Sequence, residues 1–292
     1  EELPFVEWMV DFLRWKSFKA PTAIQVQAWP AVLQGHDLIG VAETGSGKTL
    51  AYVLPMITHI LAQPHLQPGE GPIGLVLVPT RELCEQVASQ IEEVIASHPV
   101  DEDEKVKCEV LSGGHGLAGH ARQNEILALR CEIVVATPGS LIRVLDEGIT
   151  NLRRATYCVL DEADELLSSG FEGQIRQILE NLRPDRQLLL FSATWDSDQL
   201  TVLAKEVCQF EPVRIHTGSE RLAANRNIQQ FFIRVGTGDG VAFSGWPKID
   251  VISEFFQSLK TDGPQPQHMD FIRAVERVKA CDRNYAKAIL FC

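Results

Sequence analysis

A short glycine-rich stretch is the part of this sequence whose residue types point most directly to chemistry. Residues 45–49 read Gly-Ser-Gly-Lys-Thr and lie between an apolar run, 38–41, and a segment whose apolar residues recur at helical spacing. A glycine-rich turn before a helix offers backbone N–H groups and a positive dipole end to an anion. Lys48 would neutralise the β- and γ-phosphates of a nucleotide, and the Thr49 hydroxyl would bind Mg²⁺. The stretch therefore predicts a nucleotide phosphate loop, which fits kinases, GTPases and motor proteins equally.

A second group of side chains could complete such a site. Residues 161–164 read Asp-Glu-Ala-Asp and follow the apolar run 157–160, so the Asp161 carboxylate should emerge at the carboxyl edge of a parallel sheet, beside the phosphate loop. We expect Lys48, Asp161 and Glu162 to be catalytic, with Asp161 holding Mg²⁺ mostly through water and Glu162 orienting the attacking water. The alternative is an acidic helix cap followed by a solvated charge cluster, and for Asp164 and Glu165 alone that alternative is serious.

A glutamine upstream of the loop bears on the identity of the nucleotide. Gln25 ends the stretch Pro-Thr-Ala-Ile-Gln at residues 21–25. Its side-chain amide can donate a hydrogen bond to N7 of adenine and accept one from the exocyclic amine, a pairing that O6 of guanine would frustrate. Gln25 therefore favours ATP, although an isolated glutamine is more often a surface residue.

The elements around these residues predict an α/β fold. Strand-sized apolar runs alternate with helical patterns, and strands that are apolar throughout are typical of a parallel sheet with helices on both faces. We expect strands at residues 38–41, 75–78, 106–111, 133–136, 157–160, 188–191 and 213–215. We expect helices at residues 6–15, 24–33, 50–61, 82–96, 118–129, 140–145, 174–182 and 198–207.

The chain is expected to hold one large domain and part of a second. Residues 1–216 would form the first domain, including a helical preface at 1–35, and the polar residues 217–229 read as a linker. Residues 230–292 would begin a second α/β unit, with too few strands to close its own sheet. Because the chain begins with Glu1 rather than Met, we expect a segment of a longer protein.

Composition limits the class of protein. Apolar residues make up 45% of the 292 residues and charged residues 23%, as in ordinary soluble globular proteins, and no apolar run is long enough to span a membrane. The seven cysteines are odd in number and lie mostly in apolar runs, so we expect reduced thiols and an intracellular location, nucleus or cytoplasm. A formal net charge of -12 argues against bulk attraction to nucleic acid, so any such contact must be local.

Seven short motifs follow one another along the chain. They are Phe18-x-x-Pro21-Thr22-x-Ile24-Gln25, Ala42-x-Thr44-Gly45-Ser46-Gly47-Lys48-Thr49, Pro79-Thr80-Arg81-Glu82-Leu83, Gly113-Gly114, Thr137-Pro138-Gly139, Asp161-Glu162-Ala163-Asp164 and Ser192-Ala193-Thr194. In type and order they resemble the motifs of the superfamily 2 DEAD-box ATP-dependent RNA helicases, over nearly all of residues 4–216. Residues 65–77 are most similar to the branch that contains the human p68 helicase. The resemblance implies a RecA-like first domain, followed by the truncated start of a second RecA-like domain.

The resemblance also implies roles for particular residues. ATP would be bound by Phe18, Lys19, Ala20, Gln25, Ala42, Glu43, Thr44, Gly45, Ser46, Gly47, Lys48 and Thr49, with Mg²⁺ on Thr49 and Asp161. The RNA backbone would be bound without sequence preference by Pro79, Thr80, Arg81, Gly114, Thr137 and Gly139. Ser192 and Thr194 would hydrogen-bond toward Asp164 and couple the nucleotide state to strain in the RNA.

Three positions depart from the family pattern. Ser17 stands where the family usually has glycine, a minor change if the backbone there keeps a negative φ. Glu43 replaces a commoner glutamine. Ser140 replaces an arginine that would contact RNA, and Arg143, one helical turn later, could substitute for it. The aromatic residue that stacks on adenine in relatives is expected before Glu1, which would weaken adenine binding.

The implied function is that of an RNA-stimulated ATPase that clamps RNA between two domains and locally unwinds short duplexes. Arginines of the second domain would complete the ATP site, and such an arginine can be worth about 10³–10⁵ in rate, so we expect this chain alone to bind ATP and RNA weakly and to unwind nothing. Two rivals stay open: a DNA translocase of the same superfamily, and an ATP-gated RNA clamp or scaffold with little hydrolysis. We expect a monomer, with protein cofactors as potential partners and no membrane contact.

Overall fold

A parallel sheet forms the centre of the computed structural model, which describes residues 3–102, 104–113, 125, 127, 130–195, 198–208 and 210–218. Its seven strands are β1 (Leu38–Ala42), β2 (Gly74–Leu77), β3 (Cys108–Leu111), β4 (Ile133–Ala136), β5 (Tyr157–Leu160), β6 (Gln187–Ser192) and β7 (Val213–Thr217). They lie in the order β3-β4-β2-β5-β6-β1-β7, and every neighbouring pair is parallel. All carboxyl ends therefore meet at one edge of the sheet.

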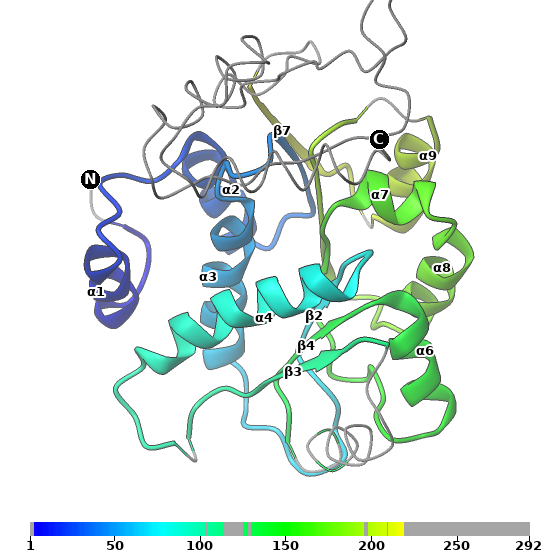
Figure 1. The fold of residues 1–292 in the computed structure, drawn as a ribbon, viewed down its shortest axis with the longest axis horizontal. Helices are drawn as coiled ribbons and strands as arrows, with labels where there is room; N and C mark the ends of the chain where they lie inside the picture. Colours follow the sequence, from blue (N-terminus) through cyan, green and yellow to red (C-terminus); the bar gives the residue numbers. More distant parts are fainter. Residues whose placement is uncertain are drawn as a thin grey trace, which may run out of the picture. The chain divides into compact units, whose positions relative to one another are not determined.

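Helices cover both faces of this sheet (Figure 1). One face is covered by α1 (Glu7–Trp15), α2 (Ala23–Leu33), α3 (Lys48–Leu61) and α4 (Arg81–Ala96), and the other by α6 (Pro138–Asp146), α7 (Ala163–Ser168), α8 (Glu172–Glu180) and α9 (Asp198–Val207). In β5, Tyr157 and Val159 pack into the first core, whereas Cys158 and Leu160 pack into the second. Burial on both faces explains why the strands are apolar throughout rather than alternating.

The expected elements are confirmed wherever the structure describes them. All seven strands and all the expected helices in the described ranges begin and end within two residues of the predicted positions. Helix α7 was missed, because six residues are too few to show a helical period. The helix expected at 118–129, the linker beyond Gly218 and the unit expected at 230–292 lie outside the described residues.

The cysteines that the structure describes form no disulfide bonds with one another. Cys84, Cys108, Cys131, Cys158 and Cys208 are free thiols, and three of them are buried. Burial raises the pKa of the Cys158 thiol to about 12, so this thiol stays protonated and unreactive. Within the described part of the chain, no helix has the length and apolar character needed to cross a membrane.

Helix α1 ends in a left-handed turn at Ser17. The N–H of Ser17 donates to the Arg14 carbonyl at 2.8 Å and the N–H of Phe18 donates to the Leu13 carbonyl at 3.1 Å, the two bonds of a Schellman motif. Helices α2, α6 and α7 end with the same pair of bonds, but there the left-handed position is a glycine: Gly35, Gly148 and Gly170. Ser17 has a φ of 59°, so the condition under which serine would be a minor change at this position is not met.

We expect Ser17→Gly to stabilise the protein. A side chain in the left-handed region costs roughly 1–2 kcal/mol of conformational free energy, which glycine would remove. Glycine also has more conformational freedom in the unfolded chain, which offsets part of this effect and leaves the free energy of unfolding higher by about 0.5–1 kcal/mol. Urea denaturation would measure it. The matched control is Ser169→Gly, an exposed serine with a φ of -79°, which should destabilise by about 0.5 kcal/mol. Equal effects of the two changes would contradict the assignment of strain to Ser17.

Candidate nucleotide-binding site

The loop between β1 and α3 has the shape of an anion cradle. Gly45 and Gly47 adopt φ values of 78° and 90°, and Gly47 is the residue directly before the first turn of α3. A Cβ atom on Gly47 would lie 2.6 Å from the Gln25 side-chain nitrogen, so no other residue fits there without a shift. The Ser46 hydroxyl is buried and has no hydrogen-bond partner within the described part of the chain. A phosphate oxygen is the kind of acceptor that would satisfy it.

Lys48 places its ammonium group over this loop. The side chain is only 6% exposed, and its Nζ donates to the Ala42 carbonyl at 3.0 Å and lies 3.4 Å from the Glu162 carboxylate. Burial raises the pKa of Glu162, and the neighbouring Lys48 charge opposes that rise. The loop lysine and the carboxylate after β5 therefore meet at one edge of the sheet, as the sequence predicted.

Asp161 lies beside them with both carboxylate oxygens held. Tyr52 donates its hydroxyl to Oδ2 at 2.7 Å, and the Glu162 backbone N–H donates to Oδ1 at 3.0 Å. Burial raises the pKa of Asp161, whereas the Tyr52 hydrogen bond and the charge of Lys48 lower it. Each oxygen keeps a further lone pair for a metal-bound water, so Asp161 and the half-buried Thr49 fit the oxygen-rich, partly hydrated environment that Mg²⁺ prefers.

These groups line one cavity of about 1420 Å³. The residues expected at the adenine end, Phe18, Lys19 and Ala20, lie on its wall and are exposed. Thr44 and Gly45, in the loop that follows Ala42, also line it and are exposed, whereas Glu43 is exposed without lining it. Gly47, Lys48, Thr49, Asp161 and Glu162 line the phosphate end. The cavity is large enough for a nucleotide.

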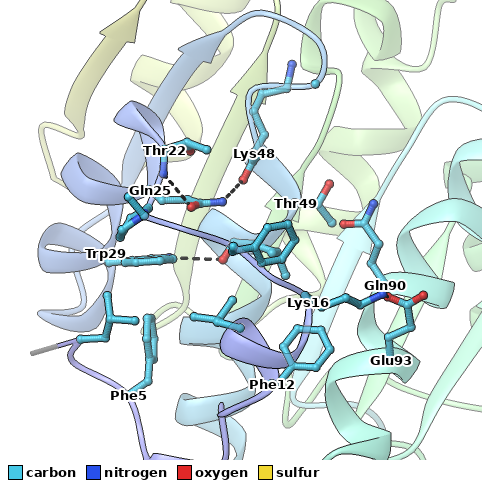
Figure 2. Close-up of a pocket in the computed structure, with 18 of the residues that line it drawn as sticks. Phe5, Phe12, Lys16, Thr22, Gln25, Trp29, Lys48, Thr49, Gln90 and Glu93 are labelled. Atoms are coloured by element: carbon cyan, nitrogen blue, oxygen red, sulfur yellow. Dashed lines mark hydrogen bonds and ion pairs between the residues drawn. The ribbon is translucent and has the colours of Figure 1, made fainter. Parts of the chain in front are cut away.

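Gln25 ties helix α2 to the phosphate loop (Figure 2). Its side-chain oxygen accepts from the Thr22 N–H at 2.9 Å in a capping box, and its nitrogen donates to the Gly47 carbonyl at 3.0 Å. The side chain is 7% exposed, and one N–H and one lone pair remain for a ligand. The contact with adenine stays a prediction, and the structure adds a role in holding the loop that the sequence did not suggest.

The residues expected to bind RNA lie after β2 and β4, which are neighbours in the sheet. Thr80 precedes α4 and accepts from the Leu83 N–H, and Thr137 precedes α6 and donates its hydroxyl to Ser140 at 3.0 Å. Pro79 is buried, Arg81 and Gly139 are exposed, and Gly114 lies outside the described residues. Arg81 is paired with Glu85, and Arg143 with Glu147, so each guanidinium would have to share or exchange its partner to contact a phosphate.

The expected coupling residues are linked as a chain rather than as a common cluster. The Thr194 hydroxyl donates to the Asp164 carboxylate at 2.7 Å. Ser192 does not bond to Asp164 in this structure; its hydroxyl donates to the Thr194 carbonyl at 2.6 Å. Ser192 is fully buried, and its hydroxyl holds the Thr194 backbone instead of contacting Asp164.

Comparison with known proteins identifies the family. A family model described as DEAD/DEAH box helicase matches residues 22–202. The chain belongs to this family. It is 46% identical over 230 residues to the ATP-dependent RNA helicase DBP2 of Scheffersomyces stipitis, and this alignment covers 79% of this chain and 41% of that protein. It is 39% identical over 296 residues to DBP2 of Debaryomyces hansenii, covering 99% of this chain and 50% of that protein. The chain thus spans between about two fifths and half of the length of these relatives.

Solved structures agree with this assignment. A DEAD box protein from Methanococcus jannaschii matches 73% of this chain and 54% of that chain, with 32% identity and a TM-score of 0.63. The yeast DEAD-box splicing factor Prp28 matches 75% of this chain and 52% of that chain, with 34% identity and a TM-score of 0.66. The RecA-like fold expected for the first domain is therefore confirmed, and the DBP2 matches fall in the branch expected from the sequence.

Sequence reasoning missed one residue of this DEAD-box site. Tyr52 touches Asp161 directly, yet it reads as an ordinary core residue of an apolar helix. The available signal was its spacing: Tyr52 follows Lys48 by four residues, which places both side chains on the same face of α3.

We expect Gln25→Ala to destabilise the protein by about 1–3 kcal/mol. The change leaves the Thr22 N–H and the Gly47 carbonyl without their partner, and a buried polar group that loses its partner bears its full desolvation cost. Gln27→Ala, an exposed glutamine in the same helix, should cost less than about 0.5 kcal/mol. Urea denaturation of both variants would test this, and equal losses would argue against the role of Gln25 as a tie to the loop.

We expect Glu162→Gln to stabilise the ligand-free protein at neutral pH. The pKa of Glu162 is raised above its ordinary value of 4.5, so the stability that this group contributes is fully present below that value and is lost as the pH rises through the raised pKa. The gain from the amide should therefore be largest near pH 7.5 and shrink toward pH 4.5. Denaturation at the two pH values would measure it, with the exposed Glu165→Gln as control. A loss of stability at neutral pH would show that attraction to Lys48 outweighs burial.

Proposed function

We propose that this chain is the ATP-binding core of an ATP-dependent RNA helicase. The observation that supports this most strongly is the convergence of Lys48, Asp161 and Glu162 at the carboxyl edge of the sheet, with Lys48 and Glu162 3.4 Å apart. The names of the DBP2 relatives, which describe ATP-dependent RNA helicases, support the same activity. Coupling of ATP hydrolysis to RNA binding requires that the two sites be structurally connected, and the paired strands β4, β2 and β5 connect the places proposed for them.

In this proposal each residue at the phosphate end has a separate task. The backbone N–H groups of the loop, the Ser46 hydroxyl and Lys48 bind the phosphates and neutralise charge that develops on them. Thr49 and Asp161 would hold Mg²⁺, which supplies electrostatic stabilisation of the transferred phosphoryl group. Glu162 orients the attacking water, and its raised pKa makes it a better acceptor for the proton of that water.

RNA binding in this proposal uses the half of the edge formed after β2 and β4. Thr80, Thr137 and Gly139 present hydroxyl and backbone groups there, and such groups suit a sugar-phosphate backbone read without base contacts. This fits the net charge of -12, because a few directed hydrogen bonds require no basic surface. We further propose that a second domain closes over this edge to clamp the RNA and to complete the ATP site, so that this chain alone binds both ligands weakly.

The test is ATP turnover by the whole protein with single-stranded RNA and with single-stranded DNA of the same length. RNA should stimulate hydrolysis strongly and DNA weakly. Glu162→Gln should retain ATP and RNA binding but lose about 10²–10⁴ in turnover, the usual range for removal of a general base. Glu165→Gln should turn over like the unchanged protein.

Each contrary outcome has its own meaning. Equal stimulation by DNA would favour a DNA translocase. RNA binding gated by ATP without turnover in the unchanged protein would favour a clamp or scaffold. Undiminished turnover by Glu162→Gln would remove Glu162 from the role given to it here.

A further inference from the structure

The Tyr52 hydroxyl contacts one of the two side chains expected to hold the metal ion. It donates to Asp161 Oδ2 at 2.7 Å, and Thr49 precedes Tyr52 by three residues in α3, so the Tyr52 and Thr49 side chains lie on the same face of the helix. Tyr52 is fully buried, so this bond is not exchanged with bulk water. Among the residues that the structure describes, Tyr52 is the one whose side chain donates a hydrogen bond to the Asp161 carboxylate.

The position of this hydroxyl is fixed by packing from two strands. The Tyr52 ring lies 5.4 Å from the ring of Phe191 in β6, and both rings are fully buried. The Tyr52 backbone carbonyl accepts a hydrogen bond from the Tyr157 hydroxyl of β5 at 2.9 Å. The ring is therefore enclosed by the core and the backbone of Tyr52 is tied to β5, and a donor held in this way can hold its acceptor in turn.

The bond to Asp161 also has a defined direction. A phenol carries its proton at neutral pH and an ionised carboxylate has only acceptor oxygens, so Tyr52 donates and Asp161 accepts. The Glu162 N–H holds the other oxygen of Asp161 at 3.0 Å. Two fixed donors, one on each oxygen, set the plane of the carboxylate and leave one lone pair on each oxygen for the metal shell.

We propose that Tyr52 is a positioning residue for magnesium at the ATP site, acting through Asp161. Partners of metal-binding groups commonly change metal affinity by about 10–100-fold when they are removed. This inference rests on the proposed function, because it takes Asp161 and Thr49 as the metal-binding groups of an ATP site. It goes further in assigning part of the magnesium affinity to a residue in the core of the domain that touches no ligand itself.

The test compares two variants that each remove one buried hydroxyl. Tyr52→Phe removes the bond to Asp161 and preserves the ring contact with Phe191, whereas Tyr157→Phe removes only the bond to the Tyr52 backbone carbonyl. Binding of a fluorescent, non-hydrolysable ATP analogue is followed as Mg²⁺ is titrated into the whole chain, with EDTA as the metal-free reference. Tyr52→Phe should raise the Mg²⁺ concentration at half-saturation by about 10-fold and leave binding in EDTA unchanged. Tyr157→Phe should leave that concentration within about 2-fold.

A merely structural role gives a different pattern. Both changes remove a buried hydrogen bond, so both should lower the melting temperature, and only the magnesium midpoint separates them. An unchanged midpoint in Tyr52→Phe, or the same shift in both variants, would overturn the proposal. Absence of magnesium-dependent binding in the unchanged chain would overturn the proposed function as well, and this would be seen before any variant is compared.

A ¹⁹F NMR measurement that keeps a tyrosine at position 52 covers the case in which Tyr52→Phe does not fold. The chain has three tyrosines, so fluorotyrosine incorporation gives three ¹⁹F resonances, and Tyr157→Phe and Tyr285→Phe assign that of Tyr52 by elimination. Addition of Mg²⁺ to the chain saturated with the ATP analogue should shift the Tyr52 resonance more than that of Tyr157. A Tyr52 resonance that does not shift when Mg²⁺ is added would contradict the proposal.

Discussion

The buried ammonium group of Lys48 is the constraint on which the site depends. A charge that is only 6% exposed loses most of its hydration and must be compensated by the protein. Its partners are the Ala42 carbonyl at the end of β1 and the Glu162 carboxylate after β5, and these strands are separated by β6. The three strands must therefore end at the same level, which the pairings of Val41 with Ser192 and of Leu160 with Leu190 achieve. The register of the sheet is therefore what brings the compensating groups to the Lys48 ammonium group.

The same edge explains how two ligands could influence each other. The phosphate loop follows β1, the residues expected to bind RNA follow β2 and β4, and β5 lies between them with pairings to both β2 and β6. Helix α7 begins directly after Glu162, and its Asp164 holds Thr194 beyond β6. A displacement of the Asp161–Glu162 turn would therefore reach Thr194 through the first turn of α7, where Asp164 lies two residues after Glu162. This is a physical basis for coupling, and no long pathway through the core is required.

The sequence predicted the strands and the position of Asp161 and Glu162 well because both depend on strong, local signals. A strand buried on both faces leaves an unbroken apolar run, and an acidic residue at its end must emerge at the sheet edge. Hydrogen-bond partners could not be predicted in this way. The amide of Gln25 suits adenine chemically, yet only the folded chain shows that Thr22 and Gly47 occupy its polar ends. Tyr52 was hidden for the same reason, since its partner Asp161 lies far away in sequence.

Two residues with the same unusual backbone show why geometry alone does not reveal function. Ser17 and Glu162 are the non-glycine residues with positive φ among those that the structure describes, at 59° and 50°. At Ser17 the left-handed turn ends a helix, a task that glycine performs at less cost in three other helices of this domain. At Glu162 glycine would relieve the same strain, but it would remove the carboxylate that faces Lys48. Strain that a simpler residue could relieve without chemical loss is incidental, whereas strain that is inseparable from a reactive group belongs to the site.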